Sequence, residues 1–187
     1  MHSAMKKTLK KLIISRINEW TEPDIYALSL FVYDENDNPC KPTVTLGYNT
    51  ERQYRESLPH AYDEAEARWN YAFWLQNDFL CFGTGETAAS VREWLVKKKL
   101  PFYEDDDPAW DDDLTYTRTA YITGEFVREL VSMVKQIHKE KVLTEKFGKE
   151  LPIIIHELEY YPEIAQQNVK ANGDLIDGSF LAFCGVK

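Results

Sequence analysis

A dense run of carboxylates lies just beyond the middle of the chain, in the sequence EDDDPAWDDD. Such side chains can bind a cation, attract a basic protein surface or simply remain in water. The one aromatic residue of the run, Trp110, favours a protein interface, where carboxylates steer a basic partner and an aromatic side chain anchors it. A solvated charged loop, or a Trp110 that pins the loop to the core, stays open as the alternative. The expected partner-binding residues are Glu104, Asp105, Asp106, Asp107, Trp110, Asp111, Asp112 and Asp113.

A calcium site of the EF-hand type is not encoded in this run. Such a loop needs Gly at its sixth position and Glu at its twelfth. Counted from Asp105, these positions hold Trp110 and Tyr116. The acidic turn that begins at Asp34 fails in the same way, because it has Pro39 and Thr45 there. We therefore predict no metal site, although clustered carboxylates can attract divalent cations weakly.

Other motifs that would carry chemistry are incomplete. The stretch GTGETA at 83–88 has the G-x-G-x-x-A pattern of a dinucleotide-binding turn, but no second strand ending in an acid follows it. His156 and Glu157 do not form H-E-x-x-H, and no G-x-S-x-G sequence is present. We predict no catalytic residue and no cofactor, and the protein is more readily explained as a binding protein than as an enzyme.

One aromatic segment offers an alternative site. The sequence RWNYAFW at 68–74 could line a ligand pocket with one amide as its polar contact. Packing in the core explains the same aromatic residues more simply. If the protein is an enzyme or a small-ligand binder, the pocket residues we expect are His60, Trp69, Asn70 and Trp74.

The charge and the cysteines limit the class of partner. Of the net charge of −9, seven units lie in the acidic run, and such a chain should repel phosphate backbones. We therefore expect no nucleic acid as a partner. No apolar stretch approaches the length of a membrane span, so no membrane contact is expected either. Three cysteines without paired spacing indicate reduced thiols and a cytoplasmic protein. The oligomeric state stays open.

The elements that must position these residues are read from periodicity and from turn residues. Helical spacing predicts helices at 6–20, 87–99 and 124–147, and a helix opened by Pro162 that ends at Asn172 and Gly173. Residues 24–33 and 43–48 form a predicted β-hairpin, and Thr50 with Gln53 forms a capping box for a short helix. Further strands are expected at 152–158 and 180–184, and the segment 63–76 is expected to pass from helix into strand.

This order of elements shows no regular βαβ alternation, no internal repeat and no low-complexity linker. It predicts a single α+β domain over residues 6–187, with several helices covering a mostly antiparallel sheet. Residues 1–5 are expected to lie outside the folded domain.

Several segments resemble a bacterial family of domains of unknown function. They are IYALSLFVYDENDNP after the first helix, LGYNTERQY, RWNYAFW, PIIIHELEY, and the closing helix with Ala171, Asn172 and Gly173. The resemblance covers most of the chain, from about Ile25 to Cys184. These motifs are structural, so the resemblance transfers no catalytic residue.

The resemblance implies a function by analogy of type. Acidic bacterial proteins of this size resemble immunity proteins, which neutralise a toxin by binding it. Together with the acidic run, it leads us to expect a bacterial cytosolic binding module of the immunity or antitoxin type, whose partner is a basic, toxin-like protein.

Overall fold

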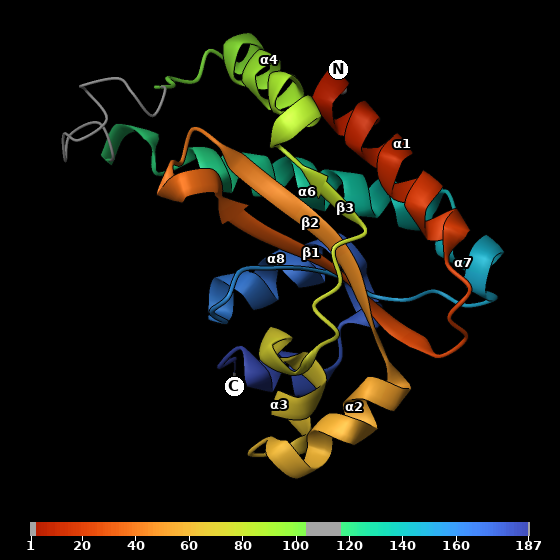
Figure 1. Ribbon diagram of the computed structural model, residues 1–187. Coiled ribbons are helices and arrows are strands. Elements are labelled where there is room, and N and C mark those ends of the chain that lie inside the picture. The colour runs from red at the N-terminus through yellow and green to blue at the C-terminus, as the bar shows by residue number, and fades with distance from the viewer. Residues whose placement is uncertain (1–2, 104–116, 187) are drawn as a thin grey trace.

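The computed structural model describes residues 3–103 and 117–186. Its centre is a four-stranded sheet in the order β3-β2-β1-β4 (Figure 1). The strands are β1 (Ile25–Asp34), β2 (Pro42–Thr50), β3 (Leu80–Phe82) and β4 (Ile153–His156). The predicted α+β class is confirmed. The sheet is mixed, because β1 is antiparallel to β2 and β2 to β3, whereas β4 runs parallel to β1.

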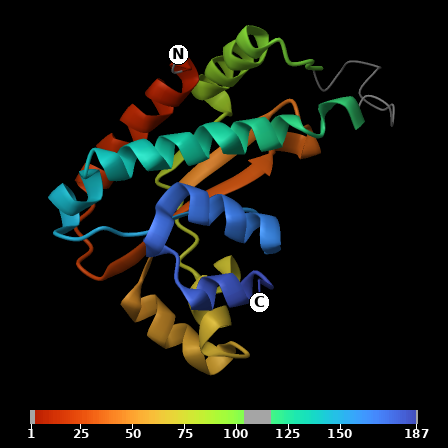
Figure 2. The ribbon, with the colours of Figure 1, turned by 180° about the vertical axis from the view of Figure 1, so that it is seen from behind.

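The helices lie on both faces of this sheet. They are α1 (Ala4–Glu19), α2 (Glu51–Ser57), α3 (Glu64–Trp69), α4 (Ala88–Lys98), α6 (Ile122–Lys139), α7 (Val142–Phe147), α8 (Pro162–Asn172) and α9 (Gly178–Phe183). Short 3-10 turns include η1 (Glu35–Asp37), η2 (Leu58–His60), η3 (Tyr71–Phe73), η4 (Gly85–Thr87) and η5 (Gly173–Leu175). Figure 2, the view from behind, shows α6, the longest of these helices, crossing in front of the sheet.

Alternation along the strands produces two hydrophobic cores. Leu28 and Leu30 of β1 face one way and pack with residues of α1, α4, α6 and α7, among them Phe126; we name this cluster the α6-side core. Ala27 and Ile154 belong to the opposite cluster, with residues of α3, α8 and α9 such as Phe180; we name it the α9-side core. The sheet is thus buried on both faces.

Many of the predicted elements are confirmed. The hairpin pairs as β1 and β2, and the side chain of Thr50 caps α2 by accepting a hydrogen bond from the amide of Gln53 at 3.1 Å. The strand expected at 152–158 forms as β4, and α8 begins at Pro162 and ends at Asn172. Gly83 has a φ of 116°, and a Cβ there would lie 2.6 Å from the carbonyl oxygen of Pro42, so this glycine serves a tight turn.

Three predicted elements are wrong. The segment 63–76 does not end in a strand: Asp63 caps α3, and the side chain of Asn70 caps η3. The helix expected at 124–147 is two helices, because Lys141 adopts a left-handed conformation with a φ of 56°. The segment 180–184 is not a strand either. Asp177 accepts a hydrogen bond from the amide of Phe180 at 2.9 Å and starts α9 instead.

The start of the chain also differs from its prediction. Ser3 caps α1, which begins at Ala4, and Met5 is buried in the α6-side core. Ala4 and Met5 are therefore part of the folded helix, and Ser3 is its cap.

In the part of the chain that the structure describes, no helix combines the length and the apolar character that crossing a bilayer requires.

Candidate functional site

The most distinctive surface feature lies where the two parallel strands end. β1 ends at Asp34 and β4 ends at His156, so Glu157 follows directly at the same edge of the sheet. A hollow of about 570 Å³ opens there. Ligands of open sheets with parallel strands bind preferentially beyond the carboxyl ends of those strands. The hollow therefore occupies a place where a binding site is expected.

The charge of this hollow is of one sign. Among the residues that the structure describes, its lining includes four carboxylates, from Asp34, Asp37, Glu157 and Glu159, and no lysine, arginine or histidine. We name it the acidic groove. Unbalanced carboxylates around a concave surface create a negative potential that attracts cations.

Asp34 is the carboxylate of the groove whose pKa is clearly changed by its surroundings. The hydroxyl of Thr123, in the first turn of α6, lies 2.8 and 2.9 Å from its two carboxylate oxygens. Burial raises the pKa of Asp34 from 3.8 to about 6; the hydrogen bond from Thr123 opposes this rise, and the charges of Glu157 and Asp37 add to it. The free carboxylate is thus poorly stabilised by the protein, which favours an external cation beside it.

Apolar and aromatic groups border the same groove. Leu158 is 72% exposed, and Tyr161 is 37% exposed while its hydroxyl lies 3.3 Å from a carboxylate oxygen of Glu157. Burial and the nearby charge of Glu157 raise the pKa of Tyr161 to about 12, so its hydroxyl stays protonated near neutral pH. An exposed leucine and an exposed tyrosine beside unbalanced carboxylates are the mixture that protein interfaces use.

A second hollow continues from the first. It has a volume of about 590 Å³ and shares Asp34, Thr123, Glu157 and Tyr161 with the acidic groove. Its far side is lined by Arg128 and Lys170, together with polar residues of α8. The surface therefore changes from purely acidic to mixed in charge along its length.

The acidic run from Glu104 to Asp113 lies outside the described residues, and so do all eight partner-binding residues predicted from the sequence. The described chain on either side of it can be located. Asn38, in the loop between β1 and β2, donates a hydrogen bond to the carbonyl of Tyr103 at 3.5 Å, and Ala120 lines the second hollow. Both flanks therefore lie at the end of the sheet that carries the acidic groove.

The alternative pocket residues do not line any of the hollows described here. Trp69 and Trp74 are only 3% and 4% exposed and belong to the α9-side core. Asn70 uses its side-chain oxygen to cap the amide of Ala72 at 2.9 Å. His60 is exposed in η2 and makes no hydrogen bond or ring contact with either tryptophan among the described residues.

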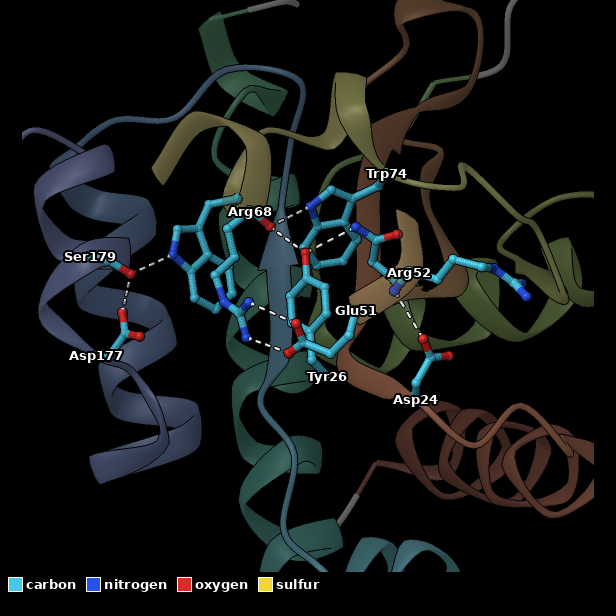
Figure 3. A network of polar contacts seen from close by, with 10 residues as sticks. Asp24, Tyr26, Glu51, Arg52, Arg68, Trp74, Asp177 and Ser179 are labelled. Carbon is cyan, nitrogen blue, oxygen red and sulfur yellow. Dashed lines mark hydrogen bonds and ion pairs between the residues drawn. The ribbon is translucent and has the colours of Figure 1, made fainter. Parts of the chain in front are cut away.

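The indole nitrogens of this segment are already bound within the protein (Figure 3). Trp69 donates to the hydroxyl of Ser179 at 2.8 Å, and Trp74 donates to the carbonyl of Arg68 at 2.9 Å. The guanidinium of Arg68 pairs with Glu51 at 2.9 Å and lies 4.2 Å from the ring centroid of Tyr26. These contacts hold β1, α2, α3 and α9 together, so the residues have a structural role.

A buried serine–histidine pair lies between the sheet and these aromatic residues. Nδ1 of His156 faces the carbonyl of Glu157 at 2.9 Å and must therefore donate to it. Nε2 is then the acceptor for the hydroxyl of Ser29, 2.8 Å away. This is the hydrogen-bond order of an activated serine. Ser29 is 2% and His156 is 0% exposed, however, and burial lowers the pKa of His156 to about 4. The pair therefore supports the sheet and does not meet a substrate.

Two further observations concern metals and thiols. No group of three or more potential metal-ligating side chains has a suitable arrangement within the ranges 3–103 and 117–186. Cys40, Cys81 and Cys184 form no disulfide with one another in the described part of the chain.

Comparisons with protein-family models, with curated proteins and with solved structures found no match to this chain. The resemblance to a bacterial domain family therefore stays a prediction.

Sequence reasoning missed the residues of the acidic groove. A usable signal was present for Asp34, which follows directly after the strand predicted at 24–33, whereas Glu157 lay inside the strand predicted at 152–158 and follows β4 only in the structure. Acids in that position gain meaning only when the two strands are known to be parallel neighbours, and the sequence indicated a mostly antiparallel sheet.

Proposed function

We propose that the protein is a binding module that engages a basic protein partner through the acidic groove, in the manner of an immunity or antitoxin-type inhibitor of the bacterial cytoplasm. One observation carries the proposal: within the described part of the chain, a hollow of about 570 Å³ presents four carboxylates and no basic side chain. Complementary charge of this kind raises the rate of association and selects against acidic partners.

Two features favour a protein rather than a free metal ion as the occupant. The exposed side chains of Leu158 and Tyr161 offer apolar contact area that a bare cation would not use. The carboxylates also lack the clustered arrangement that a metal requires among the described residues. A lysine or arginine side chain on an apolar protein surface would pair with the carboxylates, while the surface around it would contact Leu158 and Tyr161.

The acidic run adds a second part to the proposal. Its seven carboxylates and Trp110 are joined to the described chain on both sides at the end of the sheet where the groove lies. The two acidic regions would then act on one partner, with the run contributing long-range attraction.

A direct test is titration of isotope-labelled protein with a short peptide of alternating arginine and leucine, followed by NMR. We expect the amide signals of Asp34, Thr123, Glu157 and Leu158 to shift first. Affinity should fall when salt is raised from about 25 mM to about 300 mM, because exposed charges are screened beyond about 10 Å at moderate ionic strength.

Matched triple variants separate the groove from net charge. Neutralising Asp37→Asn, Glu157→Gln and Glu159→Gln should weaken binding about tenfold, since each exposed ion pair contributes up to about 1 kcal/mol. The control is Glu56→Gln, Glu64→Gln and Glu145→Gln, three exposed acids that do not line the groove. Equal losses in both variants, or no binding by the wild type, would refute the groove as the partner site. Neutralising the six aspartates of the acidic run, with Trp110→Ala, tests that segment separately.

A further inference from the structure

A hollow between the first turns of α1 and helix α4 has a different chemistry. Figures 1 and 2 both show the start of α1 beside α4. The hollow has a volume of about 470 Å³ and shares no lining residue with the acidic groove. An inference about it therefore rests on no part of the proposed function.

The N-terminus of α1 forms one wall. This helix has 16 residues, and its cap residue Ser3 accepts hydrogen bonds from the amides of Lys6 and Lys7. The amides of Ala4 and Met5 lie in the first turn of α1, where no carbonyl group of the helix can accept their hydrogen bonds. Amides at this position carry a partial positive charge and bind anions.

Trp94 of α4 supplies an independent observation. It lines the hollow and is 2% exposed, and its indole Nε1 has no hydrogen-bond partner among the described residues. An indole N–H is only a donor, so the group that satisfies it must be an acceptor. A buried donor left unpaired costs free energy, which a ligand oxygen would recover.

The charged side chains around the hollow decide which acceptor fits. Lys97 and Lys98 line it, and Lys97 is a largely exposed side chain whose nearest acid, Glu93, lies 3.5 Å away. Glu93 lines the hollow too and opposes an anion there. Hydroxyls of Thr8 and Ser90 add further donors at the wall.

We propose that this hollow binds a small oxyanion, a phosphate or carboxylate group. The anion accepts hydrogen bonds from the indole of Trp94 and from the first-turn amides of α1, and it pairs with Lys97.

The test is an NMR titration of the full chain with inorganic phosphate, and in a second arm with acetate. The indole N–H signal of Trp94 is assigned by its disappearance in Trp94→Phe. We expect this signal to shift with phosphate or with acetate, and the arm with the tighter binding identifies the ligand class. A signal that stays in place in both arms would overturn the proposal.

Three substitutions should change the affinity for the anion, two of them lowering it and one raising it. Lys97→Gln should weaken binding about threefold and Glu93→Gln should strengthen it about threefold, as expected for single exposed charges. Trp94→Phe keeps most of the ring and should weaken binding about tenfold, because it removes a hydrogen bond to a charged group. Lys7→Gln, on the exposed side of α1, is the control and should leave affinity unchanged. Equal affinities for Lys97→Gln, Glu93→Gln and wild type would show that the hollow is not the site.

Discussion

At the scale of one residue, the charged carboxylate of Asp34 lowers the stability of the folded protein while it adds to the negative charge of the groove. Its carboxyl is partly buried, accepts a hydrogen bond from Thr123 and lies near two other acids, and burial raises its pKa to about 6. A raised pKa means that the folded state holds the proton more tightly than the unfolded state does. The stabilising contribution is therefore present at low pH and is lost as pH rises through about 6.

We predict that Asp34→Asn stabilises the protein at neutral pH. Asparagine keeps an oxygen for the hydroxyl of Thr123 but carries no charge to desolvate. The gain should be on the order of 1 kcal/mol, a value reduced for the partial exposure of the site. It should grow between about pH 4 and about pH 6.5 and then level off, since the two relevant pKa values are 3.8 and about 6.

Thermal unfolding of wild type and variant across this pH range measures the effect. The control is Glu64→Gln, an exposed acid that does not line the groove, and it should show no comparable dependence. A constant difference between Asp34→Asn and wild type at every pH would show that the carboxyl of Asp34 is not the cause.

At the scale of elements, α8 closes the open edge of the sheet with two asparagine side chains. Asn172 accepts from the amide of Ile153 at 2.8 Å and donates to its carbonyl at 3.0 Å. Asn168 makes the same pair of bonds with Ile155, at 2.8 and 2.7 Å. The spacing of four residues places both amides on one face of α8, so they replace the partner strand that β4 lacks.

We predict that Asn168→Ala destabilises the protein and exposes this edge. The amide of Ile155 loses its acceptor, whereas its carbonyl keeps the side chain of Gln167 at 2.9 Å. A buried amide without a partner costs about 1–3 kcal/mol, and an unpaired strand edge promotes association between copies. Chemical denaturation and light scattering measure the two effects. Val169→Ala, next to it on the exposed side, should change neither.

The whole molecule is organised as one sheet between two cores, and its unfolding should be cooperative. β1 and β4 contribute alternate residues to the α6-side and the α9-side core, so neither core can form without the same strands. Two cores that share one sheet should unfold in one step, which is the cooperative behaviour usual for small single domains.

We predict that a truncation in either core lowers one common transition. Phe126→Ala and Phe180→Ala remove fully buried rings and should each cost about 3–5 kcal/mol. Indole signals of Trp94 and Trp69, which pack on these two rings, should disappear together with the far-UV circular dichroism in both variants. Tyr62→Ala, at 94% exposure, should change the unfolding free energy by less than about 0.5 kcal/mol. Separate transitions for the two tryptophans would divide the chain into two cooperative units.

Local patterns in the sequence predicted the elements that carry their own signals. The apolar stripe of α1, the capping residue Thr50, the β-hairpin and the start of α8 at Pro162 all depend on residues within a few positions of one another. Where a local signal was ambiguous, tertiary packing decided. The alternation of Trp69, Tyr71 and Phe73 suggested a strand. In the structure Trp69 is the buried last residue of helix α3, and the side chain of Asn70 caps the 3-10 turn that follows.

The sequence by itself determined the α+β class, the hairpin and the concentration of acid between Glu104 and Asp113. Only the tertiary structure decided that β4 lies parallel to β1, and hence that Asp34 and Glu157 line one hollow. Asp34 also meets Thr123 across a separation of 89 positions. Contacts over such separations depend on how buried surfaces of whole elements fit together, and no local spacing of residue types records that fit.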